Sequence, residues 1–446
     1  MDENLSIKKT VAYSLPAFSL ALVGIPLYVY IPKFYTDVIG INITAMGVIL
    51  LLIRIFDAVT DPLIGFLSDR TVTMYGRRRP FLAIGSILMV VSVYLLFNPF
   101  DLSVMANTIW FGIWIFMVFL FWTFVVVPYE SLGPELIYDY NKRTTLFAVR
   151  DGALIAGTLS AASAPLLITR LFKIPATDSG EKLKFFIISI IYIPVILSTI
   201  WFCIAAIKEK VPAKPVARNL NQENISVFKN RPFVILLLAY TISAIGNNLP
   251  ATLILYYVQY VLKSNSADIF LFLYFITGIL FLPFWIKISG KFGKKEAWLA
   301  SITINTGAFL GVFFLGAGDT TLYSILIIIS GIGFGATLAI PSSIQADVID
   351  YDELKTASRR EGQYIGIWSV SKKLAAAVGI GAGLAILGMV GYKPNEAQNP
   401  QVVFTLRVLY ALVPCLFNLI ALIIASYYPI DAKTHKKIRE DIKKTK

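Results

Sequence analysis

The sequence predicts an all-α membrane protein with twelve transmembrane helices in two six-helix halves. The chain of 446 residues is 57% hydrophobic and 15% charged. Its mean hydropathy of +0.71 is too high for a soluble protein with one solvated surface. Apolar runs of about 20 residues recur along the chain, each long enough to cross a hydrocarbon core of roughly 30 Å as a helix. Basic residues gather in alternate connections between these runs.

The predicted spans are separated by short connections, with one exception. The first six spans cover residues 11–35, 44–68, 80–97, 107–133, 144–172 and 184–207, and the second six cover 232–262, 268–287, 297–316, 321–345, 363–391 and 402–427. The longest polar connection contains Pro212 and Pro215 and separates the two groups. We therefore predict an N-terminal bundle over residues 1–207, a cytoplasmic linker over 208–231, a C-terminal bundle over 232–427 and a basic cytoplasmic tail over 428–446.

The net charge of +13 does not indicate a nucleic-acid partner, because the basic residues gather in alternate connections between the spans. Most Lys and Arg residues outside the spans lie in the connections after the second, fourth, sixth, eighth and tenth spans. By the positive-inside rule these connections are cytoplasmic, so both termini are cytoplasmic in an integral protein of the cell (inner) membrane. The connection after the fifth span departs from this pattern with Arg170 and Lys173.

The loop after the second span combines small, acidic and basic residues, namely Asp69, Arg70, Gly76, Arg77 and Arg78. A similar run, Gly290-Lys291-Phe292-Gly293-Lys294-Lys295, follows the eighth span. This weak internal repeat indicates duplicated six-helix halves, an architecture found in transporters. We interpret the loop as a gating or structural motif.

The sequence offers little for cysteine, metal or cofactor chemistry. Cys203 and Cys415 lie inside apolar spans, so neither a disulfide nor a transition-metal site is expected. The single histidine, His435, lies in the basic tail, where we expect it to be solvated. We predict no cofactor.

Charged residues within a span are expensive and mark candidate functional sites. The second span contains Arg54, Asp57, Thr60 and Asp61 near its middle. Asp57 and Asp61 are spaced i, i+4 and share a helix face. Two carboxylates one turn apart can supply oxygen ligands to a monovalent cation or share a proton. A purely structural pair of Asp57 with Arg54 is the alternative, but one arginine cannot neutralise two carboxylates. The spacing therefore predicts a cation site at Asp57 and Asp61.

Other spans also carry charge inward. The fourth contains Thr123 and Glu130, the fifth Arg150 and Asp151, and the eleventh Lys372 and Lys373. Arg150 with Asp151 is either a self-contained pair or a cavity contact. The two consecutive lysines cannot face the same way on a helix, so one is expected to face a cavity while the other extends to the interface.

Three further residues have both a binding and a packing interpretation. Asn247 in the seventh span can hydrogen-bond a solute or join helices. Tyr129 and Trp368 can stack on a sugar ring or contact an acyl chain, although aromatic residues on membrane helices more often pack.

Three motifs in order resemble the glycoside–pentoside–hexuronide:cation symporter family, the melibiose-permease group of the major facilitator superfamily. They are Asp57-Ala58-Val59-Thr60-Asp61-Pro62 with the loop Asp69 to Pro80, Pro128-Tyr129-Glu130-Ser131-Leu132-Gly133-Pro134 followed by Arg150, and Ala346-Asp347-Val348-Ile349-Asp350-Tyr351 followed by Trp368 and Lys373. The resemblance spans nearly the whole chain.

The resemblance implies a transporter and no enzyme: symport of an organic solute with Na⁺, Li⁺ or H⁺ by alternating access. The matching cation-binding positions are Asp57, Asp61 and Thr123. Thr60 stands where the melibiose permease has an asparagine ligand, which leaves Na⁺ and H⁺ both open. Lys373 matches a lysine beside the family's cation site.

The residues that match the family's sugar site depart from its pattern. The melibiose permease binds sugar through carboxylates at positions that hold Ala21 and Val126 here. We expect a small organic or amphipathic solute at the midplane between the halves, contacted by Glu130, Arg150, Asn247 and Lys373 with Tyr129 and Trp368. A glycoside or other sugar-like solute and a lysophospholipid both remain open.

Two other classes fit less well. Intramembrane prenyltransferases also use aspartates at i, i+4, and Asp347, Asp350 and Asp352 form a second acidic cluster. The first acidic pair lies near mid-membrane and the second acidic cluster lies at a helix end. The two are therefore too far apart to bind one diphosphate. A structural or receptor-like protein would not need charges on four spans. We expect a monomer in the bilayer.

Overall fold

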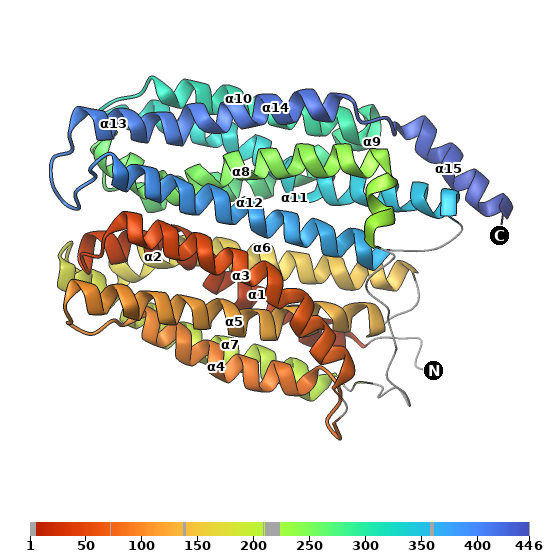
Figure 1. Cartoon of the computed structure of the whole chain (residues 1–446), viewed down its shortest axis with the longest axis horizontal. Coiled ribbons are helices and arrows are strands. Elements are labelled where there is room, and N and C mark those ends of the chain that lie inside the picture. Colours follow the sequence, from red (N-terminus) through yellow and green to blue (C-terminus); the bar gives the residue numbers. More distant parts are fainter. Residues whose placement is uncertain are drawn as a thin grey trace. The chain divides into compact units, whose positions relative to one another are not determined.

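The computed structural model describes residues 6–71, 73–136, 140–207, 209, 224–356 and 361–445 (Figure 1). In the N-terminal half the helices are α1 (Ile7–Ile25), η1 (Pro26–Tyr30), α2 (Ile31–Lys33), η2 (Phe34–Val38), α3 (Ile43–Arg70), α4 (Arg79–Phe97), α5 (Val104–Leu136), α6 (Tyr140–Leu171) and α7 (Asp178–Ala206). In the C-terminal half they are η3 (Asn224–Lys229), α8 (Arg231–Tyr260), α9 (Ala267–Phe292), α10 (Lys294–Phe313), α11 (Thr320–Thr356), α12 (Glu361–Met389), α13 (Pro400–Arg407), η4 (Val408–Leu412), α14 (Val413–Ser426) and α15 (Ala432–Thr445).

The described structure confirms the all-helical fold, and each predicted span corresponds to a helix or to a continuous series of helices. Eleven of the described helical segments are long and apolar enough to cross a bilayer. The remaining predicted span corresponds to α10, whose first turn contains Lys294, Lys295 and Glu296 and whose middle contains Asn305. These residues lower its hydropathy. Most of the predicted linker, residues 208 and 210–223, lies outside the described residues.

Polar residues set where several helices begin. Asn42 accepts a hydrogen bond from the backbone N–H of Ala45 at the start of α3, and Thr177 accepts one from Gly180 at the start of α7. Such side chains satisfy amide groups that have no partner within the helix. These caps place the apolar runs in helices with fixed starting points.

The first span changes its winding twice. The π-helical turns η1 and η2 interrupt it, and Pro26 and Pro32 lie at the first residue of η1 and within α2. A proline removes one backbone N–H from the helical ladder, so a neighbouring turn can widen without losing a further bond. Tyr28, which contacts the candidate ion site, lies in η1.

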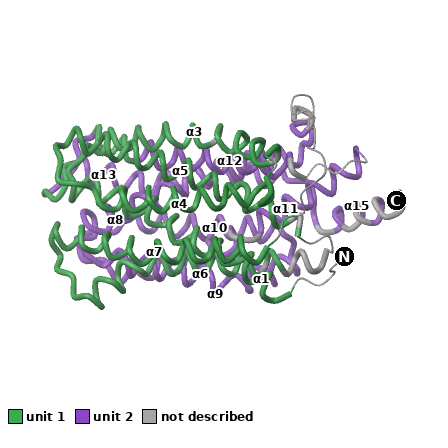
Figure 2. Tube along the Cα trace, turned by 90° about the horizontal axis from the view of Figure 1, so that it is seen from below, with its two compact units in different colours: residues 1–217, 384–389, 393–396 green, residues 218–383, 390–392, 397–446 purple. Residues whose placement is uncertain are grey.

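The chain divides into two compact units, shown in green and purple in Figure 2. The N-terminal unit comprises residues 1–217, 384–389 and 393–396. Within it α1 packs on α6 and α7, and α5 packs on α3 and α4. Gly157 of α6 allows a close approach to α1, since a Cβ atom there would collide with the carbonyl oxygen of Phe18. Small residues at such crossings let membrane helices pack backbone to backbone.

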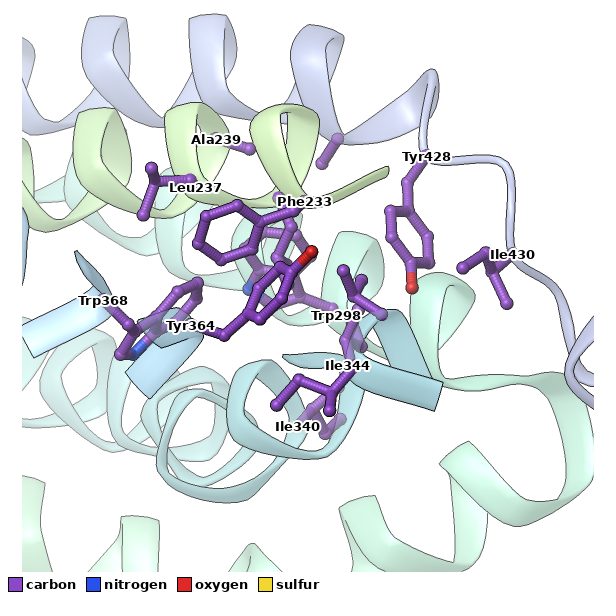
Figure 3. Packing of buried hydrophobic residues seen from close by; sticks show 14 of the residues in the cluster. Phe233, Leu237, Ala239, Trp298, Ile340, Ile344, Tyr364, Trp368, Tyr428 and Ile430 are labelled. Atoms are coloured by element: carbon purple, nitrogen blue, oxygen red, sulfur yellow. The ribbon is translucent and has the colours of Figure 1, made fainter. Parts of the chain in front are cut away.

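The C-terminal unit comprises residues 218–383, 390–392 and 397–446. In it α11 packs on α9 and α10, and α14 packs on α8. An aromatic core joins α8, α10 and α12, with Phe233, Trp298, Tyr364 and Trp368 close together in Figure 3. The rings of Phe233 and Tyr364 meet edge to face at a centroid separation of 4.7 Å.

Candidate functional site

One face of α3 carries a buried ion pair. Arg54 Nη1 donates to Asp57 Oδ2 at 2.9 Å, and the two residues are 5% and 4% exposed. The Arg54 guanidinium lies over the rings of Phe119 and Tyr28, at 3.7 Å and 4.5 Å from their centroids. Both rings stabilise the cation through their π faces and exclude water from it. The charges therefore interact in a low-dielectric environment, where electrostatic effects are large.

Thr123 of α5 touches both carboxylates of α3. Its hydroxyl oxygen lies 2.8 Å from Asp57 Oδ1 and 3.1 Å from Asp61 Oδ1. The Thr123 residue is 1% exposed. A hydroxyl has one proton, so Thr123 donates to one carboxylate at a time. The structure thus brings Asp57, Asp61 and Thr123 into contact across two helices.

We call Arg54, Asp57, Asp61 and Thr123 the α3–α5 cluster. With both carboxylates ionised, these four side chains carry one positive and two negative charges. Thr60 lies beside them and is 4% exposed. Its hydroxyl donates to the backbone oxygen of Asp57 at 3.1 Å, which leaves the lone pairs of the Thr60 oxygen to accept or to coordinate. Carboxylate and hydroxyl oxygens are suited to a hard cation or a proton.

Tyr129 and Glu130, on the same helix as Thr123, have different surroundings. The Tyr129 hydroxyl donates to the backbone oxygen of Tyr13 at 2.7 Å, and the residue is buried. Its ring packs on that of Tyr13 at a centroid separation of 5.1 Å. Tyr129 therefore joins α5 to α1, whereas Glu130 is exposed.

Arg150 of α6 forms an ion pair with its neighbour Asp151. The guanidinium donates to Asp151 Oδ1 from Nε at 2.9 Å and from Nη2 at 2.7 Å. It also lies over the ring of Phe147, 4.9 Å from the centroid. The Asp151 side chain is 56% exposed, so an incoming anion can compete for Arg150 without having to break a buried pair.

Asn247 of α8 belongs to a polar network within the C-terminal unit. Its amide oxygen accepts from Asn418 Nδ2 at 3.1 Å and from Asn305 Nδ2 at 3.3 Å, and its own Nδ2 donates to Ser243 at 3.1 Å. Asn305 in turn accepts from Ser330 at 2.6 Å. The network joins α8, α10, α11 and α14.

The two candidates on α12 differ in burial. Trp368 is 8% exposed and packs in the aromatic core of Figure 3, with its ring 4.2 Å from that of Tyr240. Lys373 is partly exposed, and its neighbour Lys372 is exposed. Asn247, Trp368 and Lys373 all belong to the C-terminal unit.

The loop between α3 and α4 wraps around a carboxylate. Glu209, just after α7, accepts hydrogen bonds of 2.7–3.1 Å from the backbone N–H groups of Arg77, Arg78 and Arg79. Gly76 has a φ of +113°, which favours glycine, and its missing side chain leaves room for the Glu209 carboxylate. Arg70 lies over the ring of Phe66 at 4.0 Å, and the side chain of Asp69 lies outside the described residues.

Sequence reasoning missed two of these contacts. Glu209 was not predicted, because it lies over a hundred residues from the Gly-Arg-Arg-Arg loop in the sequence and no local pattern links the two. We expected His435 to be solvated, but it contacts two carboxylates. Its Nε2 lies 3.0 Å from Asp350 Oδ2 and 3.3 Å from Asp347 Oδ1. No local pattern indicates that α15 packs on α11.

The comparisons with known proteins agree with this geometry. A solved structure of a bacterial homologue of the human lysosomal transporter Spinster has the same fold, with a TM-score of 0.63 at 13% identity, covering 98% of this chain and 97% of that one. A glucuronide carrier protein homologue of Escherichia coli (strain K12) is 28% identical, with 99% of this chain and 96% of that protein covered. A putative sulfoquinovose importer of Salmonella typhimurium is also 28% identical, with 99% and 94% covered.

The described residues form eleven helical segments long and apolar enough to span a membrane, several of these spans carry charged residues, and the relatives are named as carriers and importers. These features define a secondary transporter of the major facilitator superfamily. The family model described as MFS/sugar transport protein matches residues 12–432, so the chain belongs to that family, in the glycoside–pentoside–hexuronide:cation symporter group. It is an integral membrane protein that transports a small solute and is not an enzyme.

Proposed function

We propose that the chain is a cation-coupled symporter of a sugar-like solute in the cell's inner membrane. The supporting observation is the α3–α5 cluster, in which one buried arginine faces two carboxylates that share contact with Thr123. Carboxylate and hydroxyl oxygens gathered at membrane depth are the ligands that a small cation or a proton takes. The cluster therefore favours binding of a monovalent cation from water.

The residues suit either Na⁺ or H⁺ as the coupling ion. For Na⁺, Asp57 and Asp61 supply charged oxygens while Thr60 and Thr123 supply neutral ones. For H⁺, the two carboxylates hold one proton between them because adjacent negative charges repel each other. In both cases the bound ion makes the cluster neutral, which lowers the cost of moving α3 between conformations and couples the ion to transport.

Two observations support a sugar that carries an acid group. The two relatives described above are named for a glucuronide and for sulfoquinovose, which bear a carboxylate and a sulfonate. In this chain Arg150 offers a guanidinium whose partner, Asp151, is exposed. Arginine binds carboxylate and sulfonate groups through paired hydrogen bonds. We propose Arg150 as the contact for the acid group.

Uptake into proteoliposomes tests the coupling. With methyl β-D-glucuronide as probe, an inward Na⁺ or H⁺ gradient is expected to accelerate uptake at least tenfold in the wild type. Asp57→Asn is expected to abolish this acceleration because the variant leaves the cluster neutral. Asp101→Asn removes a carboxylate of an exposed ion pair with Lys182 and is the matched control. Gradient-dependent uptake by Asp57→Asn would rule out the site.

The proposed orientation places both termini in the cytoplasm. It is supported by the basic residues in alternate connections, including Arg77 and Arg78 after α3 and Lys294 and Lys295 after α9. A reporter enzyme that works only in the periplasm, fused after Lys446, is expected to stay inactive. An active fusion would reverse the assignment.

A further inference from the structure

A cavity of about 440 Å³ lies in the C-terminal unit, apart from the candidate residues described above. It is bounded by the end of α8, by the connection that follows it and by α13, with Tyr260, Lys263, Ala397, Phe404 and Arg407 among its lining residues. This volume falls within the range of small-molecule sites. Two of the side chains that line it are cationic.

These two cations are not neutralised by ion pairs. Among the described residues, neither Lys263 nor Arg407 forms a salt bridge, and Arg407 Nε is buried without a hydrogen-bond partner. Asp319 and Arg407 both lie beside Gly316, but Asp319 does not line the cavity and its carboxylate accepts from the N–H of Gly316 at 2.8 Å. The cavity is therefore positively charged.

The backbone around Lys263 is held in an uncommon conformation. Lys263 has a φ of +51°, in the left-handed region that non-glycine residues seldom adopt. Hydrogen bonds on both sides fix it: the N–H of Ser264 donates to Val258 O at 3.0 Å, and the N–H of Gly318 donates to Leu262 O at 3.1 Å. The position of the lysine is thus determined by its surroundings.

The placement of these charges is unusual for a membrane protein. In the proposed topology, which this inference takes from the proposed function, the ends of α8 and α12 and the start of α13 face outward. The positive-inside rule disfavours lysine and arginine there. In the described connections after α8, α10 and α12 and in α13, the basic residues are Lys263, Lys393 and Arg407, and two of the three line one cavity.

We propose that this cavity is an outer binding site for a soluble sugar acid, where the anion is captured before transport. Arg407 presents a planar fork that matches a carboxylate or sulfonate, and Lys263 adds a point charge. The rings of Tyr260 and Phe404 offer apolar faces for the C–H groups of a sugar, and Phe404 is 59% exposed. Electrostatic capture of this kind raises the association rate of a charged solute.

Cysteine labelling tests the cavity without requiring transport. Ala397 is exposed, whereas the native Cys203 and Cys415 are buried, so Ala397→Cys provides a single reactive thiol. In right-side-out membrane vesicles, D-glucuronate is expected to slow reaction with a membrane-impermeant maleimide at least threefold. D-glucose at the same concentration is expected to leave the rate unchanged.

Charge variants in the same Ala397→Cys background sharpen the test. Lys263→Gln alone, and together with Arg407→Gln, is expected to remove the protection by glucuronate. Lys393→Gln removes an outer cation that pairs with Glu396 and does not line the cavity, so protection is expected to persist. Because Lys263 is an exposed loop residue, its variant tests the proposal even if the double variant fails to fold.

Four results would overturn the proposal. Equal protection by glucuronate and glucose would show that charge is not recognised, and protection in the double variant would show that other residues bind. Slowing by phosphatidylglycerol vesicles, with no effect of glucuronate, would identify a lipid headgroup as the ligand. Labelling in inverted vesicles alone would place the cavity on the cytoplasmic side and overturn the proposed orientation. The ion dependence of uptake would remain a separate test of coupling.

Discussion

The two units each bury a set of polar side chains, and the sets differ in charge balance. In the N-terminal unit, Arg54 faces Asp57 and Asp61 with Thr123 between the carboxylates. In the C-terminal unit, Asn247, Asn418, Asn305, Ser243 and Ser330 form a neutral network. Both sets join helices from distant parts of the sequence.

The difference separates a binding site from an element that holds helices together. In the amide network each hydrogen bond described above matches a donor with an acceptor, so the network needs no ligand to be stable. In the α3–α5 cluster the acceptors are carboxylates, and Thr123 has one proton for two of them. A set of neutral amides and hydroxyls stabilises packing, whereas two carboxylates beside hydroxyl oxygens can bind a cation or share a proton.

The amide network should matter for stability and not for ion binding. Asn418 is 0% exposed and contacts Ser243 and Asn247, so Asn418→Ala leaves buried polar groups without partners. This is expected to cost about 1 to 3 kcal/mol of unfolding free energy. Denaturation of the purified protein in detergent measures it.

The matched control is Asn248→Ala, because the Asn248 amide donates only to Ala244 O of its own helix. This variant is expected to be the more stable of the two. A loss of ion dependence in Asn418→Ala, with stability unchanged, would show that the network takes part in ion binding. The proposed difference in role between the amide network and the α3–α5 cluster would then be wrong.

Within the cluster, the hydroxyl of Thr123 should have a smaller and more specific effect. Thr123→Val preserves the shape of the side chain but removes the oxygen between the carboxylates. Ion affinity is expected to fall about tenfold, equivalent to about 1.4 kcal/mol. Thr123→Ser keeps the hydroxyl and is expected to restore most of the affinity.

Ion titration of solute uptake measures this effect. Thr158→Val serves as the control, because the Thr158 hydroxyl is bonded to Leu154 O of its own exposed helix face. An affinity loss of the same size in Thr123→Ser would mean that packing, and not the oxygen, is responsible.

Local sequence rules predict the spans and the shared face of Asp57 and Asp61, because both follow from helix geometry within one segment. They do not predict partners from distant segments. Thr123 was placed beside α3 through the family resemblance, and the Arg54 contact with Phe119 requires the packing of α5 on α3. Asn247 had two interpretations from sequence, and its contact with Asn418 shows what its amide binds in the described structure.

The same limit applies to the loops. Glu209 lies over a hundred residues in the sequence from Arg78, whose backbone N–H donates to it. The predicted direction of the sixth span does not show that Glu209 reaches this loop. The winding of the first span was also unexpected: its prolines were visible, but where π-helical turns form depends on contacts with neighbouring helices.

The central claim is that the α3–α5 cluster binds one coupling cation, and ion-dependent stabilisation of the purified protein tests it most directly. Thermal unfolding would be followed for the wild type and for Asp61→Asn while Na⁺, Li⁺ and H⁺ are titrated separately. We predict that at least one of these ions raises the melting temperature of the wild type and that none has this effect on Asp61→Asn. An equal ion-dependent shift in both proteins would contradict the claim.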